Sequence, residues 1–303
     1  MNKQIVIFGP TAVGKTKLAA RLAYRFNGEI ISADSRQVYI GMNIGTGKDY
    51  ADYVVEGEKI SYHLIDVFEP TEEYNLVRFI EDYNTAFTKI ISSNKIPFLT
   101  GGTMLFIDAI LSGYELNKVN FENAKKKYEK FTNEQLREKL LKISSRLHNT
   151  TDLTDRERMI KALVIAEGDD EKIISPIKSH SLNICILPER KIIYHRIDER
   201  LSKRLKNGMI EEVENLVKLG ISFSKLEFFG LEYRFISKYL KGELNYNDMK
   251  QKLASAIKNF AKRQITWIRK IEKKGMPILF FNSPDEKEIS VAVQNFLNDL
   301  NAR

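Results

Sequence analysis

The residues best suited to chemistry form an octapeptide near the N-terminus, Gly9-Pro10-Thr11-Ala12-Val13-Gly14-Lys15-Thr16. It matches the phosphate-binding pattern G-x-x-x-x-G-K-[ST], in which glycines let the backbone N–H groups point at phosphate oxygens. Lys15 adds a positive charge, and the Thr16 hydroxyl suits a Mg²⁺ ion. Because the octapeptide follows an apolar run and opens a helical pattern, we expect it to bind phosphate rather than to be a chance turn.

Two further segments could place side chains beside that loop. Asp34 follows the apolar run Ile30–Ser32, and Thr103 follows the run Ile96–Thr100 and a glycine pair. Asp34 could be a general base or a metal-linked residue, but aspartate is also common in turns and at helix N-caps. A glycine pair permits close approach of the backbone to a ligand, although it also forms ordinary turns.

A weaker candidate lies between these segments, where His63 and Asp66 flank a short apolar run. Asp66 could act at one remove from a metal ion, as the acidic residue of a Walker-B segment does. A purely structural role explains these two residues at least as well.

The elements that must position these residues are predicted by apolar runs that alternate with helical patterns. Runs too short for helices and typical of buried strands are Gln4–Phe8, Ile30–Ser32, Ile96–Thr100, Asn183–Leu187 and Pro277–Phe281. Helical patterns, such as Lys15–Phe26 and Leu76–Ser92, lie between them. With the phosphate loop, this alternation predicts an α/β fold: a P-loop NTPase-like parallel sheet flanked by helices.

One segment breaks the alternation. Residues 115–180 are rich in Lys and Glu, contain no convincing strand, and predict helices over Phe121–Phe131, Asn133–Ile143 and Asp155–Glu167. We therefore expect a catalytic core made of residues 1–114 and 181–303, with 115–180 as a helical insertion domain.

Charge is concentrated in one part of the chain. The whole sequence carries a formal net charge of +8, yet residues 191–275 hold 20 basic and 10 acidic side chains. These residues predict long, basic, amphipathic helices at 191–220 and 246–274. Such a stretch could contact phosphates or a nucleic acid, or it could be a solvated helical face; charge alone does not decide.

Composition excludes several other classes of protein. Hydrophobic residues make up 43% and charged residues 29% of 303 residues, as in ordinary globular proteins. No apolar run is long enough for a transmembrane helix, and the N-terminus does not resemble a signal peptide. A single cysteine, Cys185, cannot form an internal disulfide or a zinc cluster, so we expect a reducing, cytoplasmic setting.

Taken together, the motifs resemble those of the tRNA dimethylallyltransferases, also called tRNA isopentenyltransferases. The matching segments run in family order over nearly the whole chain: Gly9–Thr16, Ile31–Tyr39 (ISADSRQVY), Gly41–Lys48 (GMNIGTGK), His63–Asp66 (HLID), Pro97–Leu105 (PFLTGGTML) and Arg263–Arg269 (RQITWIR). No single segment would be specific, but their combination is.

The resemblance implies transfer of a dimethylallyl group from dimethylallyl diphosphate to N6 of adenosine 37, 3′ of the anticodon, in tRNAs reading codons that begin with U. The diphosphate would lie on the phosphate loop with Mg²⁺, which Thr16 would help to hold. By motif position, Asp34 would take the proton from the adenine amine, Thr103 would hydrogen-bond near the reacting centre, and Arg200 would help to neutralise the leaving diphosphate.

The resemblance also implies a tRNA anticodon stem-loop as the partner. Separately, we expect a monomer that does not involve a membrane. The residues expected to contact the RNA are Asp34, Ser35, Arg36, Gln37, Thr103, Arg158, Lys161, Lys262, Arg263 and Arg269. Trp267, the only tryptophan, is better explained as an anchor that fixes its helix to the sheet than as a platform for a base.

This sequence departs from the family pattern in its RNA-facing stretches. Glu157 stands where the family usually has glutamine, and Lys161 where it has arginine; Glu227 and Glu232 flank a Gly-Leu pair where the family has Gly-Tyr. Glutamates facing phosphates would be repulsive. A paralogue with altered RNA preference therefore stays open, as does a P-loop small-molecule or nucleoside kinase. A non-catalytic nucleic-acid-binding module would explain the charge but not the phosphate loop.

Overall fold

The computed structural model describes residues 2–117, 126–128, 130–143, 156–166 and 173–299. The chain divides into two compact units, one formed by Met1–Gly113 and Pro176–Arg303 and the other by Tyr114–Ser175. None of the helices in the described ranges combines the length and apolarity needed to span a membrane.

A six-stranded parallel sheet forms the centre of the first unit. Its strands, in spatial order, are β10 (Leu279–Phe281), β9 (His180–Ile186), β1 (Lys3–Phe8), β6 (Ile96–Gly101), β2 (Gly28–Ser32) and β5 (Tyr62–His63). The five predicted strands are therefore confirmed, with ends that shift by one to three residues. Their apolar side chains are buried because helices cover both faces of a parallel sheet.

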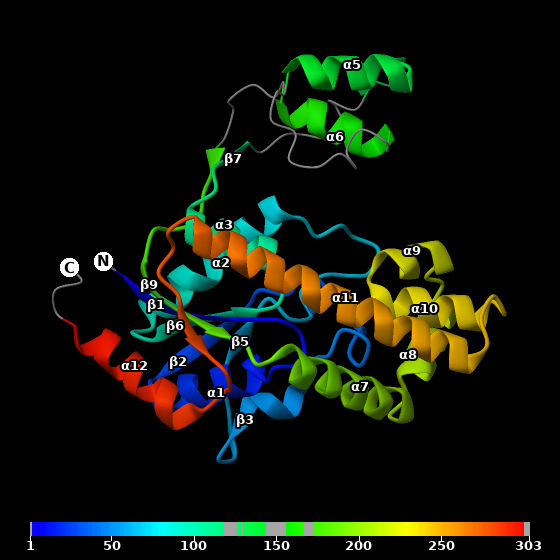
Figure 1. Ribbon diagram of the computed structural model, residues 1–303. Coiled ribbons are helices and arrows are strands. Elements are labelled where there is room, and N and C mark those ends of the chain that lie inside the picture. Colours follow the sequence, from blue (N-terminus) through cyan, green and yellow to red (C-terminus); the bar gives the residue numbers. More distant parts are fainter. Residues whose placement is uncertain (1, 118–125, 129, 144–155, 167–172, 300–303) are drawn as a thin grey trace. The chain divides into compact units, whose positions relative to one another are not determined.

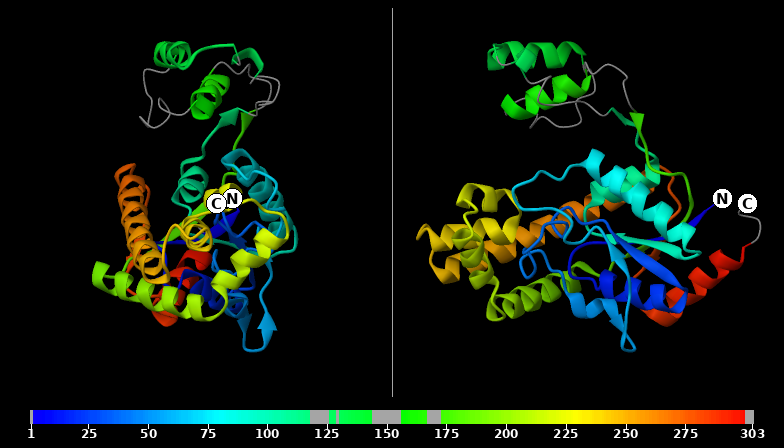
Figure 2. Two further views of the ribbon diagram at one scale, coloured as in Figure 1. Left: turned by 90° about the vertical axis from the view of Figure 1, so that its right-hand side faces the viewer. Right: turned by 180° about the vertical axis from the view of Figure 1, so that it is seen from behind.

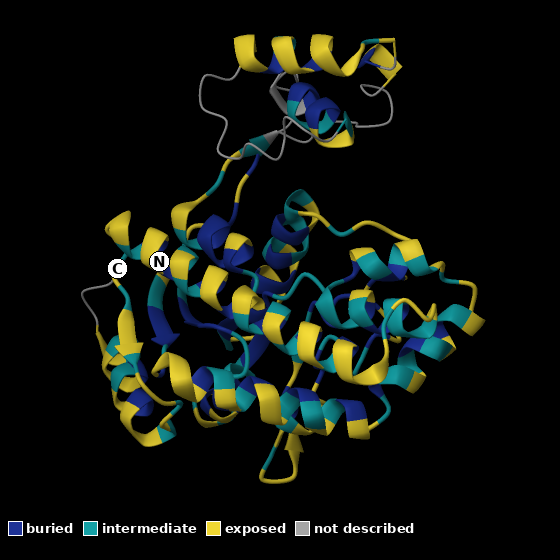
Figure 3. Ribbon diagram, turned by 45° about the vertical axis from the view of Figure 1, so that its right-hand side comes forward, coloured by how far each residue is buried: buried dark blue, intermediate teal, exposed yellow. Residues whose placement is uncertain are grey.

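Helices α1 (Lys15–Arg25) and α12 (Glu286–Asn298) cover one face of the sheet, and α2 (Leu76–Ser92) and α3 (Met104–Ser112) cover the other (Figure 1). The fold class is the α/β class that the sequence predicted. The core contains alternate strand residues such as Ile5 and Ile7 together with Leu18 and Leu22 of α1. Figure 3 shows the buried strands inside helices whose outer surfaces are exposed.

The C-terminal half adds helices at the carboxyl edge of the sheet: α7 (Arg190–Lys206), α8 (Met209–Lys218), α9 (Phe223–Phe228), α10 (Leu231–Leu240) and α11 (Tyr246–Lys273). The predicted helical regions at 191–220 and 246–274 are confirmed, the first as two helices separated by Gly208, whose φ is 94°. The side chain of Asn245 caps α11 by accepting a hydrogen bond from the N–H of Asp248 (2.9 Å). Helix α11 packs against α7, α10 and α3.

The two ends of the described chain meet beside α12 (Figure 2). Lys3 Nζ donates to the carbonyl oxygens of Phe296, Leu297 and Asp299, at 2.9, 3.1 and 2.7 Å. A lysine at this position satisfies carbonyl groups that a helix C-terminus leaves without partners. The last helix is thereby fastened to the first strand.

Within the second unit, α5 (Asn133–Ile143) and α6 (Arg156–Ala166) pack against each other. Their core contains Leu136, Leu140, Met159 and Leu163. The predicted helix Phe121–Phe131 lies in part outside the described residues. The expectation that residues 115–180 lack strands was wrong, because β7 (Leu116–Asn117) pairs with β8 (Ile173–Ile174). Each of these strands has only two residues, which is too few to give a recognisable sequence pattern.

Candidate active site

The phosphate loop connects β1 to α1 through a backbone that requires glycine. Gly9 has φ 152°, and a Cβ on it would lie 2.3 Å from the carbonyl oxygen of Ile186 on β9. Gly14, the N-cap of α1, has φ 85°. Both conformations favour glycine. Lys15 Nζ donates to the carbonyl of Pro10 (2.7 Å), so the lysine folds back over its own loop.

The segments that contain Asp34 and Thr103 are locked together at the ends of β2 and β6. A Cβ on Gly101 would lie 2.2 Å from the carbonyl oxygen of Ala33, so the glycine permits this close approach. The N–H of Thr103 donates to that same oxygen (3.1 Å), and the N–H of Ser35 donates to Thr103 Oγ1 (3.0 Å).

Asp34 forms a turn and also lines the cavity described below. Its Oδ1 accepts hydrogen bonds from the N–H groups of Arg36 (2.9 Å) and Gln37 (3.3 Å). No described residue is hydrogen-bonded to Oδ2, so one carboxylate oxygen serves the turn and the other remains available.

Gln264 of α11 connects the phosphate loop to the loop that follows β6. Its Oε1 accepts from the N–H of Thr11 (2.9 Å), and its Nε2 donates to the carbonyl of Gly102 (2.7 Å). The side chain is buried, with 3% of the residue exposed. Sequence reasoning found the segment that contains Gln264 but not this role, which a polar residue on the buried face of an amphipathic helix could have signalled.

These segments enclose a cavity of about 580 Å³. Ten of the residues predicted for the site line it: Thr11, Lys15, Thr16, Asp34, Ser35, Arg36, Gln37, Thr103, Arg200 and Arg263. Gly9, Pro10, Ala12, Val13 and Gly14 supply the loop backbone behind it. Lys262 and Arg269 are exposed on α11 away from the cavity lining, and Arg158 and Lys161 belong to α6 in the second unit.

The cavity is positively charged beside the phosphate loop. Burial, and secondarily the charge of Arg200, lower the pKa of Lys15 to about 8, while Asp34 opposes the shift. Arg200 Nη1 donates to Thr11 Oγ1 (3.3 Å), so α7 delivers its guanidinium to the loop. An anion bound here would be attracted by both groups.

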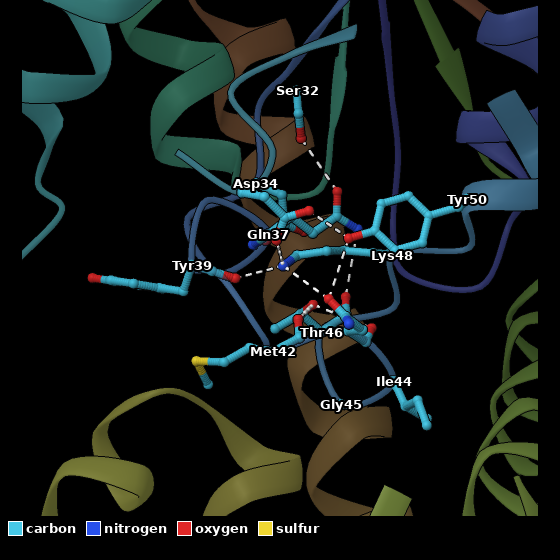
Figure 4. Close-up of polar contacts among 12 residues, drawn as sticks. Ser32, Asp34, Gln37, Tyr39, Met42, Ile44, Gly45, Thr46, Lys48 and Tyr50 are labelled. Atoms are coloured by element: carbon cyan, nitrogen blue, oxygen red, sulfur yellow. Dashed lines mark hydrogen bonds and ion pairs between the residues drawn. The ribbon is translucent and has the colours of Figure 1, made fainter. Parts of the chain in front are cut away.

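The loop Gly41–Lys48 forms another side of the cavity. Gln37 Nε2 donates to the carbonyl of Gly47 (3.0 Å). Ser32 Oγ donates to Gln37 Oε1 (3.3 Å), as Figure 4 shows. A Cβ on Gly45 would lie 2.6 Å from the Tyr233 ring, so this loop is pressed against α10.

Glu212 of α8 holds the same loop from the outside. Its carboxylate accepts hydrogen bonds from three consecutive N–H groups, those of Asn43, Ile44 and Gly45, at 2.8, 2.6 and 3.0 Å. The Tyr233 hydroxyl donates a fourth bond, at 2.7 Å. Nothing in the sequence pattern singled out this residue.

His63 and Asp66 lie outside the cavity lining and serve the structure. His63 Nε2 contacts Glu29 Oε2 (2.8 Å), which belongs to a cluster with Lys95. Asp66 accepts hydrogen bonds from the buried Lys48 and from Tyr50. In the described part of the chain, no three His, Cys, Asp or Glu side chains are grouped to hold a metal ion.

The far rim of the cavity comes from α9, α10 and α11. Phe228 is 54% exposed, and the Arg36 guanidinium lies 5.2 Å from its ring centroid. Trp267 Nε1 donates to Asp108 Oδ2 (3.1 Å) on α3, so this tryptophan fastens α11 to a helix rather than to the sheet, and its ring lines the cavity. Glu227 is paired with Lys241 at 2.9 Å.

Comparisons with known proteins agree on one family. The pattern described as IPP transferase matches residues 37–271, and the one described as isopentenyl transferase matches residues 2–64. A tRNA dimethylallyltransferase of Geotalea uraniireducens is 48% identical over 277 residues, which is 90% of each chain. One of Azobacteroides pseudotrichonymphae is 43% identical and covers 98% of this chain and 95% of its own.

Solved structures show the same fold. The full-length tRNA isopentenylpyrophosphate transferase of Bacillus halodurans is 30% identical, with a TM-score of 0.70 over 98% of this chain and 96% of its own. A eukaryotic dimethylallyltransferase that acts on tRNA has a TM-score of 0.80 at 23% identity, a likeness of fold alone. By its sequence and its fold, the chain belongs to the IPP transferase family.

Proposed function

We propose that this protein is a tRNA dimethylallyltransferase. It transfers the dimethylallyl group of dimethylallyl diphosphate to N6 of adenosine 37 in tRNA, giving N6-(dimethylallyl)adenosine and diphosphate. The observation that carries this proposal is the composition of the cavity. The phosphate loop with the cations Lys15 and Arg200 and the carboxylate of Asp34 all line it, and a base could bind beside that carboxylate. The relatives at 48% identity bear the name of the same activity.

The donor's diphosphate is held by the N–H groups of the phosphate loop, by Lys15 and by Arg200. Negative charge develops on the diphosphate as the bond to the allylic carbon breaks, and cations already in place stabilise it without reorganisation. Thr16 lines the cavity beside Lys15, and its hydroxyl would hold a Mg²⁺ ion together with diphosphate oxygens. Bound there, the ion would neutralise part of the developing charge.

Asp34 is the base in this proposal. The adenine amine attacks the allylic carbon, its proton passes to Asp34 Oδ2, and diphosphate leaves. Thr103, hydrogen-bonded to the N–H of Ser35, fixes the segment that carries the aspartate. Because a base stacked in an anticodon loop cannot reach such a cavity, adenosine 37 is flipped out of the stack before it reacts.

The basic side chains on α11 supply affinity for RNA phosphates rather than sequence preference. Arg36 and Gln37, at the cavity, contact the target base or its neighbours. The ion pair between Glu227 and Lys241 removes one source of the repulsion that Glu227 would cause. Arg158 and Lys161 of the insertion contribute further RNA contacts. The protein works as a monomer and in the cytoplasm, where its tRNA substrates are.

One assay tests this function against its rivals. The protein is incubated with dimethylallyl diphosphate, Mg²⁺ and unmodified tRNA, and the nucleosides are analysed by mass. We expect N6-(dimethylallyl)adenosine, absent when Lys15→Ala replaces the wild type. ATP-dependent phosphorylation of a nucleoside without prenyl transfer would favour the kinase, and tRNA binding without any product would favour the binding module.

A further inference from the structure

A second arginine of α7 lies in the same cavity, one helical turn after Arg200. Arg204 has a side chain that is only 12% exposed, yet it lines the cavity. Its Nη2 is buried and makes no hydrogen bond within the described part of the chain. A buried guanidinium nitrogen left in this way is costly, and such groups normally find a partner.

Arg204 and Arg200 present their charges to the same place. A Cβ built on Gly47 would lie 1.9 Å from Arg204 Nη2 and 2.2 Å from Arg200 Nη2, so the two nitrogens are neighbours beside this glycine. Burial, and then the charge of Arg200, lower the pKa of Arg204 to about 10. Like charges repel at this range, and an anion between them would turn the repulsion into attraction.

The acidic groups nearby satisfy this pair only in part. Asp49 Oδ2 lies 3.5 Å from Arg204 Nη2 and 3.7 Å from Arg200 Nη2, but its side chain is 58% exposed and the contact with Arg204 is not aligned as a hydrogen bond. Glu232, which also lines the cavity, attracts Arg204 electrostatically without an ion pair within 4 Å. One exposed carboxylate shared by two guanidinium groups leaves room for a stronger acceptor.

We propose that Arg204 is a second diphosphate-binding residue, which with Arg200 grips the donor's diphosphate and then the diphosphate that leaves. This inference rests on the proposed function. A diphosphate rather than an RNA phosphate is the ligand that fits, because Arg200 reaches Thr11 of the phosphate loop and thereby places the arginine pair beside that loop. Two planar guanidinium groups can hold adjacent phosphoryl oxygens with more hydrogen bonds than a lysine could.

The test measures binding of inorganic diphosphate, with Mg²⁺, to the full chain by calorimetry. We expect Arg204→Gln to weaken binding roughly 10- to 100-fold, the usual effect of removing a hydrogen-bonded charge from a phosphate. Arg204→Lys should recover part of the affinity. Arg190→Gln, an exposed arginine at the start of the same helix, is the matched control and should bind as the wild type does. Arg204→Met, which fills similar space, replaces the glutamine variant if that one does not fold.

The rival explanation is that Arg204 only balances the charge of Glu232. In that case Arg204→Gln and Glu232→Gln would lower the melting temperature by similar amounts and leave diphosphate affinity unchanged, which would overturn the proposal. Weaker diphosphate binding with Arg204→Gln but not with Glu232→Gln would support it. If the wild type binds no diphosphate, the proposed function of the phosphate loop fails together with this inference. If the wild type binds diphosphate and modifies tRNA, but the Arg204 variants bind diphosphate as tightly as the wild type, this inference alone fails.

Discussion

Asp34 forms a turn and also lines the cavity, so the two roles that the sequence presented as alternatives are compatible. Its Oδ1 holds a turn through the N–H groups of Arg36 and Gln37, as a purely structural aspartate would. The same side chain lines the cavity next to Lys15 and Thr103. The turn therefore fixes the carboxylate in place, and a fixed carboxylate is what a general base requires.

Replacing this residue by its amide separates the two roles. The amide side chain would keep an oxygen for the turn but could not accept a proton, so we expect Asp34→Asn to keep its melting temperature and diphosphate affinity while single-turnover prenyl transfer falls about 10²- to 10⁴-fold. Asp285→Asn, at the N-cap of α12, changes the same kind of group outside the cavity lining and should leave the rate unchanged. A wild-type rate in Asp34→Asn would remove this aspartate as the base.

We expect Lys15 to make donor binding depend on pH. Its pKa of about 8, lowered chiefly by burial, means that the free protein loses this charge as the pH rises past that value. Affinity for dimethylallyl diphosphate should then fall as the pH is raised from about 7 to about 9, by at most about tenfold per pH unit for one proton.

Lys15→Arg, which stays charged over this range, should show a flatter profile and so corrects for ionisation of the ligand. Calorimetric titration of both proteins at several pH values makes the comparison. Parallel profiles would mean that Lys15 does not titrate where we expect.

Sequence patterns found the residues that belong to motifs and missed those that act through geometry alone. The phosphate loop, Asp34 and Thr103 could be identified because glycine spacing and strand ends mark them. Glu212 and Arg204 are single polar residues on helices, and nothing local distinguishes a polar side chain that faces a cavity or a loop from one that faces solvent. Gln264 differs, because it stands on the buried face of an amphipathic helix, which is a local signal. Only the packing of the helices gives Gln264 and Glu212 their partners and brings Arg204 to the cavity.

At the scale of elements, the loop Gly41–Lys48 illustrates how a helix can shape a site without lining it. The loop has no regular structure of its own, so its backbone N–H groups need partners from elsewhere. Glu212 supplies them for three residues in a row, and Lys48 and Gln37 fasten the other side. Gly47, in the same loop, lies beside Arg200 and Arg204.

Removing that support should damage both stability and the site. We expect Glu212→Ala to lower the free energy of unfolding by about 2–3 kcal/mol, because it strands N–H groups that had a charged acceptor. Glu212→Gln keeps one acceptor oxygen and should lose less. Urea unfolding and donor affinity are measured together, with Glu211→Ala, an exposed neighbour on α8, as the control. Equal stability of the Glu212 and Glu211 variants would show that the loop holds itself.

Long or strongly apolar elements were predictable and short ones were not. β1, β6 and β9 are apolar runs that a parallel sheet buries on both faces, and α2 has both a helical period and a capping Asn75. No element was predicted for residues 221–245, which contain α9 and α10, because helices of six and ten residues show too little periodicity. β5 comprises only Tyr62–His63, since positive φ angles at Leu64 and Asp66 end its extended backbone.

At the scale of the whole molecule, two units divide the expected work. The first contains the cavity and the basic helix α11, to which we assign the proposed prenyl transfer. The second has its own small core around Leu136 and Leu163, which is enough to hold α5 and α6 together. Its ends are paired as β7 and β8. An RNA-binding role for it remains a prediction.

Charge reversal in α6 tests that role in the intact protein. If Arg158 and Lys161 contact tRNA, replacing both by Glu should weaken tRNA binding and reduce the slope of log affinity against log salt by about one unit for each phosphate that the protein no longer neutralises. Binding of inorganic diphosphate should not change, since the cavity lies in the other unit.

Arg137→Glu, on the exposed surface of α5 in the same unit, is the matched control for a general change of charge. A reduction in the double variant that exceeds twice the effect of Arg137→Glu on log affinity would mean that α6 presents a specific contact surface. Equal losses of tRNA affinity for each reversed charge would mean that the insertion acts only through its overall charge. No loss of tRNA affinity in the double variant would leave α11 and the cavity rim as the surfaces that bind RNA.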